Sequence, residues 1–130
     1  MNRLLPTLLL LAACASSPDA GPSRAADTRL VHDVFFTLQD SSPEACDALA
    51  TACLALAEIP GVVHLTAGVR DASQQRNVNR ADYHVGLHVE FDSAEAYDAY
   101  GPHPVHQALV ETHKGNFAAV EVFDYLPTGR

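Results

Sequence analysis

The stretch from Leu30 to Gln39 carries large apolar side chains on both of its faces, and this constrains the fold more than any other feature. Successive residues alternate between the two faces of an extended chain, and many are of the β-branched and aromatic types that favour a strand. One face presents Leu30, His32, Val34, Phe36 and Leu38, and the other presents Val31, Asp33, Phe35 and Thr37. Strands with apolar residues on both faces need protein on both sides. The sequence therefore argues against a sheet that leaves one face in water.

The remainder of the chain supplies further alternating and helical segments. Strands are also predicted over 62–70, 83–91 and 116–126. Helices are predicted over 43–58, 94–100 and 105–113. Ser41 with Glu44, and Asp92 with Glu95, have the spacing of capping boxes and mark the starts of the first two helices. The order βαββααβ predicts an α+β, ferredoxin-like sheet with its helices on one face.

This architecture leaves the second face of the sheet without helices. The first and third strands are both expected to carry apolar residues on both faces, and such residues need protein on the second face as well. Another copy of the same sheet is the simplest cover, so we expect a homodimer with two-fold symmetry.

The first residues have the layout of a secretory signal. Arg3 precedes an apolar run from Leu4 to Ala13, and small residues stand immediately before Cys14. The run is about ten residues long, which is too short to span a bilayer. The ending Leu11-Ala12-Ala13-Cys14 resembles the lipobox of bacterial lipoproteins, whose signal is cleaved before a cysteine that becomes lipidated. The alternative is a signal peptide without lipid that happens to contain a cysteine.

These features divide the chain into four parts. They are a lipoprotein signal peptide over 1–13, a flexible tether over 14–28, one domain over 29–127 and a tail over 128–130. The tether is rich in Ser, Pro, Gly and Ala and has no hydrophobic periodicity. Lipid on Cys14 would anchor the protein in the bacterial cell envelope. Ala15 after the cysteine favours the outer membrane, with the domain facing the periplasm.

Charge and cysteine content narrow the function classes. A formal net charge of −8 without a basic cluster argues against nucleic-acid binding. Cys46 and Cys53 lie on one face of a predicted helix, about 10 Å apart along its axis, which is too far for a disulfide. They are interpreted as buried small side chains.

His103 and His106 are the best-spaced candidates for metal ligands, but the sequence contains no zinc-type motif. We therefore expect no metal and no cofactor.

Five short motifs are distributed over the domain. They are Val31-His32, Ile59-Pro60-Gly61-Val62, Val89-Glu90-Phe91-Asp92-Ser93, Tyr100-Gly101-Pro102-His103-Pro104-Val105-His106 and Val122-Phe123-Asp124-Tyr125. Together they resemble the stress-responsive A/B barrel family, of the dimeric α/β-barrel superfamily. The resemblance covers Leu30 to Leu126, and the tyrosine–histidine stretch is its most specific part. It implies a homodimer whose two sheets pack into a barrel.

One branch of that family resembles plant polyketide cyclases, which close an aromatic ring without a cofactor. The tyrosine and the second histidine of the tyrosine–histidine stretch line the cyclase pocket, with the histidine as base. These positions correspond to Tyr100 and His106, and the histidine opening the first strand corresponds to His32. This chain departs from the branch at Val85, where a histidine is usual. The resemblance therefore implies a cyclase pocket that is only partly reproduced.

We expect a pocket between the helices and the sheet. His32 shares a strand face with Val34 and Phe36, and the tight link between the last two helices can turn Tyr100 and His106 toward that strand. A small apolar pocket with a few convergent polar groups is typical of a ligand site. We interpret Tyr100 and His106 as candidate catalytic residues and the strand residues as ligand-binding.

His103 is a further candidate for ligand binding, although structural roles are open for both histidines of the stretch. His103 stands where a side chain can cap a helix, and His106 is placed to bond a backbone carbonyl. Two functions remain. The first is a membrane-tethered domain that binds a small apolar or aromatic molecule without catalysis. The second is a cofactor-free, polyketide-cyclase-like enzyme with His106 as general base.

Overall fold

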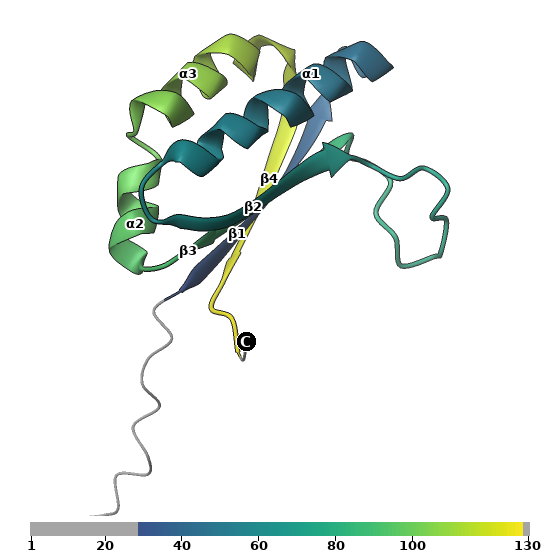
Figure 1. Ribbon diagram of the computed structural model, residues 1–130. Helices are drawn as coiled ribbons and strands as arrows, with labels where there is room; N and C mark the ends of the chain where they lie inside the picture. The colour runs from purple at the N-terminus through teal and green to yellow at the C-terminus, as the bar shows by residue number, and fades with distance from the viewer. Residues whose placement is uncertain (1–28, 129–130) are drawn as a thin grey trace, which may run out of the picture.

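The computed structural model describes residues 29–128, which form one sheet covered by a layer of helices (Figure 1). In chain order the elements are β1 (Leu30–Leu38), α1 (Pro43–Cys53), the 3-10 helix η1 (Leu54–Glu58), β2 (Val62–Val69), β3 (Val85–Phe91), α2 (Ala94–Tyr100), α3 (Pro104–His113), η2 (Lys114–Asn116) and β4 (Phe117–Tyr125). The predicted signal peptide and tether, with Cys14, lie outside the described residues. Across 29–128, the helices are all too short or too polar to cross a membrane.

The four strands form one antiparallel sheet in the order β2-β3-β1-β4. Helices α1, α2 and α3 all lie on the same face of this sheet (Figure 1). The predicted ferredoxin-like α+β fold is thereby confirmed. Strands β2 and β4 are the two edges, and the central strands β1 and β3 carry all the buried apolar side chains that the sheet contributes.

The core lies between the helix layer and the sheet. The predicted apolar stripe of the first helix packs against the strands, and its members are Cys46, Leu49, Cys53 and Leu56. Both cysteines are free and buried. Burial raises the pKa of the Cys53 thiol to about 12, which keeps it protonated and unreactive. The sheet contributes Val34, Phe36, Leu38, Val85, Leu87, Val89 and Phe91.

The two predicted capping boxes are each displaced by one residue. Ser42, not Ser41, caps α1, and its Oγ accepts a hydrogen bond from the Ala45 backbone N–H at 3.3 Å. Ser93, not Asp92, caps α2 in the same way. The reason at α1 is Pro43, whose ring suits the first helical position and so makes the preceding residue the cap. The last turns of the predicted first helix are 3-10 rather than α.

Gly61 joins η1 to β2 and sets the position of α2. Its φ is +88°, a left-handed conformation that glycine adopts without strain. A Cβ atom at this position would collide with the Cβ of Ala96. The close approach therefore depends on glycine, and it holds in place the helix that carries Tyr97 and Tyr100.

The sheet face without helices, called the open face below, is aromatic on one side and polar on the other. β1 and β4 present Phe35, Phe123 and Tyr125 there, with Phe123 52% exposed and Tyr125 48% exposed. β3 instead presents Gly86, His88 and Glu90. The expectation of apolar residues on both faces of the third strand is therefore wrong, because every large apolar residue of β3 points toward the helices.

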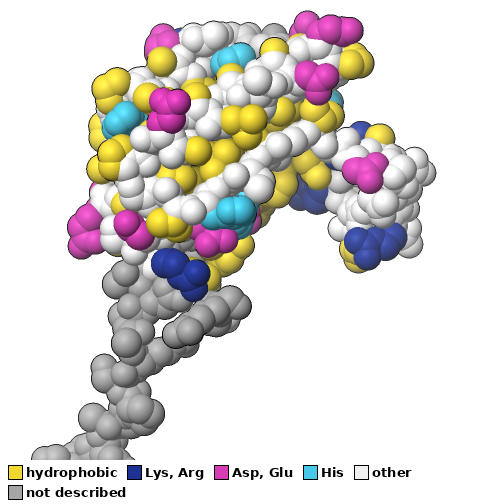
Figure 2. Space-filling view, viewed as in Figure 1, with side chains coloured by type: hydrophobic (Ala, Val, Ile, Leu, Met, Phe, Trp, Pro, Cys, Tyr) yellow, Lys and Arg dark blue, Asp and Glu magenta, His cyan; other side chains and the backbone are white. Residues whose placement is uncertain are grey.

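The long loop between β2 and β3 projects from the body of the domain and carries basic side chains (Figures 1 and 2). Arg80 near its end pairs with Asp82 and lies 3.7 Å from the Glu121 carboxylate of β4. These ion pairs are exposed and contribute little to stability.

Candidate functional site

A cavity of about 320 Å³ lies between the sheet and helix α3. β1 contributes His32, Val34 and Phe36, which alternate along the strand and so share its helix-facing side. The rest of the lining comes from α2, α3, η1 and the neighbouring strands and is mostly apolar: Leu56, Leu87, Tyr100, His106, Leu109, Val110, Phe117, Val120 and Val122. This volume is in the range of small-molecule sites.

The cavity opens along the edge strand β4. Val120 and Val122 face the helix side of the sheet, yet they are 44% and 48% exposed. Both line the cavity, so they form part of its mouth. The cavity is therefore open to solvent between β4 and α3.

Three polar side chains converge at one end of this apolar space. The ring centroids of Tyr100 and His106 are 4.7 Å apart, and those of Tyr100 and His32 are 5.8 Å apart. The same three residues also line a second, more open hollow of about 330 Å³, together with Tyr97, Asp98 and Gly101. They therefore lie between the apolar cavity and a second, more polar hollow.

His106 lies in the first turn of α3 and is held in one tautomer. Its Nδ1 is 2.9 Å from the carbonyl oxygen of Gly101, which can only accept, so Nδ1 carries the proton. Among the described residues, Nε2 has no hydrogen-bond partner. Burial lowers the pKa of His106, the Gly101 carbonyl partly opposes this, and His32 lowers it further. At neutral pH the ring is therefore uncharged, with the Nε2 lone pair free to accept a proton.

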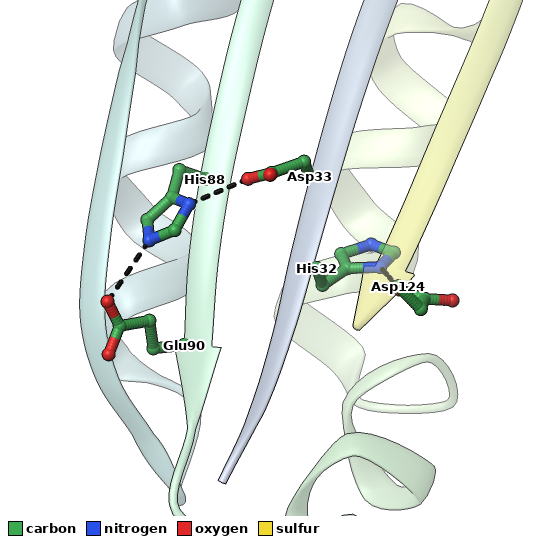
Figure 3. A network of polar contacts seen from close by, with 5 residues as sticks. All are labelled: His32, Asp33, His88, Glu90 and Asp124. Atoms are coloured by element: carbon green, nitrogen blue, oxygen red, sulfur yellow. Dashed lines mark hydrogen bonds and ion pairs between the residues drawn. The ribbon is translucent and has the colours of Figure 1, made fainter. Parts of the chain in front are cut away.

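His32 is buried and held by Asp124, a residue that the sequence argument did not select. The His32 Nδ1 donates to the Asp124 Oδ1 at 2.7 Å (Figure 3), and the Tyr97 hydroxyl donates to the Asp124 Oδ2 at 2.9 Å. Because a carboxylate only accepts, it fixes the proton of a neutral His32 ring on Nδ1. The register of the sheet pairs His32 directly with Asp124. An antiparallel pairing of the first and last predicted strands would have placed His32 next to Asp124 and so predicted this pair.

Tyr100 is 3% exposed, and its ring packs edge-on against His32 and Phe91. Burial raises its pKa well above the ordinary value for a phenol. The hydroxyl forms no hydrogen bond within residues 29–128, and its oxygen is not fully buried, because no fully buried side-chain oxygen there lacks a partner. Tyr100 is therefore a neutral hydrogen-bond donor, not a base.

His103 and His84 have structural roles. His103 caps α3, with its Nδ1 accepting from the Val105 backbone N–H at 3.2 Å, and it does not line the cavity. His84 accepts from the Leu38 backbone N–H at 2.9 Å. Val85, which stands where the cyclase branch has a histidine, is fully buried in the core. Of the predicted site, the cavity therefore brings together His32, Val34, Phe36, Tyr100 and His106 but not His103.

The described residues contain no group of three or more His, Cys, Asp or Glu side chains arranged to hold a metal ion. The site is instead built from two histidines, one phenol and an apolar lining. These groups can bind an apolar molecule, accept and donate hydrogen bonds, and transfer a proton.

The fold and this cavity define a ferredoxin-like α+β domain with a small-molecule-sized space between sheet and helices. Residues 30–127 match the model of the stress-responsive A/B barrel domain. The chain belongs to this family. No curated protein matches the sequence.

Solved structures share the fold over most of the domain. A stress-responsive A/B barrel family protein from Mesorhizobium loti is 30% identical, with 78% of this chain and 98% of that chain covered and a TM-score of 0.61. A dimeric ferredoxin-like protein of unknown function from Thermobifida fusca is 20% identical, with 76% and 91% covered and a TM-score of 0.62. SnoaB, a cofactor-independent oxygenase from Streptomyces nogalater, is 13% identical, with 79% and 96% covered and a TM-score of 0.59. At the last two identities the likeness is one of fold alone.

Proposed function

We propose that this chain binds a small apolar or aromatic molecule in the cavity between β1, β4 and α3. The observation that carries this proposal is the composition of the cavity, an apolar chamber with polar side chains at one end only. The chamber would hold the apolar part of the ligand, and Tyr100 and His106 would bond its polar group. His32 and Asp124 would fix the orientation of that group from the strand side.

A second candidate function is proton-transfer catalysis without a cofactor. The observation that favours it is His106, whose Nε2 is unpartnered and unprotonated beside the Tyr100 ring. In such a reaction Nε2 takes a proton from an acidic C–H bond, and the electron pair moves onto the adjacent carbonyl oxygen. The Tyr100 hydroxyl then donates a hydrogen bond to that oxygen. Because the pKa of His106 is lowered, the rate should rise with pH below about 6.5 and level off at neutral pH.

Replacing His106 separates these roles from a purely structural one. If the ring serves only to bond the Gly101 carbonyl, His106→Ala should cost about 1–3 kcal/mol of unfolding free energy. His106→Asn, which keeps a donor, should recover part of that loss. We expect both variants to lose ligand affinity, and any turnover, beyond what thermal melts of the unliganded protein explain. Reduced melting temperature with unchanged ligand affinity would contradict a site role for His106.

We also propose that the chain forms a homodimer through the open face of its sheet. The aromatic side chains of Phe35, Phe123 and Tyr125 support this, because they are clustered on a face that no described helix covers. The Thermobifida fusca structure with the same fold is described as dimeric. In a dimer of this kind the two helix layers face outward, so both ligand cavities stay accessible.

The remaining proposal is that the domain is tethered to the bacterial envelope through lipid on Cys14. It is supported by the apolar run that ends in Leu11-Ala12-Ala13-Cys14. Mass spectrometry of the chain purified from bacterial membranes should find cleavage before Cys14 and the mass of acyl chains on it. Cys14→Ser should abolish both modifications. Wild-type protein without acyl mass, or processing that is the same in the variant, would contradict lipidation.

A further inference from the structure

A polar cluster interrupts the open face where the aromatic residues end. His88 of β3 lies between two carboxylates (Figure 3). Its Nδ1 is 2.6 Å from the Asp33 Oδ1 of β1, and its Nε2 is 3.2 Å from the Glu90 Oε1 of its own strand. This is the side of the sheet opposite His32 and the cavity. The proposed ligand site makes no use of these residues.

The geometry requires a doubly protonated ring. Each imidazole nitrogen of His88 faces an oxygen that, in an ionised carboxylate, can only accept a hydrogen bond. Both nitrogens must therefore donate, which makes the ring an imidazolium. Burial alone would lower the pKa of His88, but the hydrogen bonds and charges of Asp33 and Glu90 outweigh it and raise the pKa. One positive charge then offsets two negative ones.

The flanking strands complete the surroundings of His88. On β2, the ring centroid of His64 is 5.8 Å from that of His88. On β4, Tyr125 lies against Asp33, and burial together with that carboxylate raises the pKa of Tyr125, so its hydroxyl stays neutral. In the single chain the side chains of His88, Asp33 and Glu90 are still 30%, 23% and 28% exposed. A partner sheet on this face would remove most of the remaining water.

We propose that the open face binds a second copy of this chain tightly only while His88 is protonated, so that this cluster makes self-association dependent on pH. The inference rests on the homodimer proposed above. Removing water from two carboxylates is costly unless a cation remains bound between them. Loss of the His88 proton leaves the negative charges of both carboxylates without a cation in the interface. The dimer then dissociates more readily.

The direction follows from proton linkage. Burial of the cluster in a dimer strengthens the pairing of His88 with its carboxylates, so association raises the pKa of His88 further. Affinity is then greatest below that pKa and falls as the pH rises through it. A shift of one pKa unit changes the association constant about tenfold for each His88, or about a hundredfold for a dimer that contains two.

Sedimentation of the full chain in a mild detergent, at pH 6 and pH 9, measures this directly. We expect the dimer dissociation constant to rise by about a hundredfold between the two values. His88→Gln should weaken the dimer at pH 6 and remove most of the pH dependence. His64→Gln is the matched control, since it changes the neighbouring histidine, which forms no hydrogen bond to the two carboxylates, and it should keep the wild-type dependence. Circular dichroism at both pH values checks that each variant is folded.

The possible failures are distinguishable. A wild-type dissociation constant that is equal at the two pH values overturns the inference while leaving the homodimer intact. A pH dependence that persists in His88→Gln assigns the effect to another group and also overturns it. A chain that stays monomeric at both pH values overturns the homodimer, and the inference with it. The variant Asp33→Asn/Glu90→Gln should dimerise with little pH dependence, because no carboxylates remain to be compensated.

Discussion

Replacing Phe91 by alanine should lower the unfolding free energy by about 3–5 kcal/mol. Phe91 is fully buried at the end of β3. Its ring packs edge-on against Tyr100 and Tyr97 at 5.0 and 5.5 Å between centroids, and against His32 at 6.4 Å. The substitution leaves a cavity that this set of rigid rings cannot readily fill. Urea unfolding followed by circular dichroism measures the loss.

The same substitution should also lower ligand affinity, because the Phe91 ring packs against both Tyr100 and His32 and holds them in position. Leu54→Ala is a suitable control, since Leu54 is 51% exposed and its removal should change stability by no more than about 0.5 kcal/mol. A Phe91→Ala loss below about 1 kcal/mol, close to that of the control, would contradict the packing described for this end of the sheet.

Local patterns in the sequence were sufficient to predict the helices and strands and the side of the cavity that β1 contributes. The strand at 30–39 has one helix-facing set of alternating residues, and alternation alone places His32, Val34 and Phe36 together. The placement of Tyr100 and His106 against that set came instead from the family resemblance. The structure agrees with that placement, because the short link after α2 brings both rings to the cavity.

Two kinds of feature could not be predicted from local patterns: contacts set by the register between strands, and helix caps for which adjacent residues compete. The pairing of His32 with Asp124 joins residues 92 positions apart, and only the register of β1 on β4 brings them together. The helix caps were displaced because adjacent residues, such as Ser41 and Ser42, are equally good cap types. The His88 cluster was missed because it likewise depends on cross-strand register, which sets Asp33 beside His88.

The central claim is that a small apolar molecule binds in the cavity beneath α3, and a titration with 4-hexylphenol followed by NMR tests it most directly. Val122 is at the mouth of the cavity and partly exposed, so Val122→Phe can block the space without disturbing the core. Val63→Phe makes the same change on the opposite edge strand, away from the cavity. Because β-branched and aromatic residues both suit exposed strand positions, both variants should fold.

We expect the alkylphenol to shift the amide resonances of the cavity-lining segments of β1 and α3 in the wild-type chain and in Val63→Phe. In Val122→Phe the affinity should fall by at least about tenfold, which corresponds to about 1.4 kcal/mol. Absence of any shift in the wild-type chain, or equal affinity in Val122→Phe and Val63→Phe, would contradict binding in this cavity.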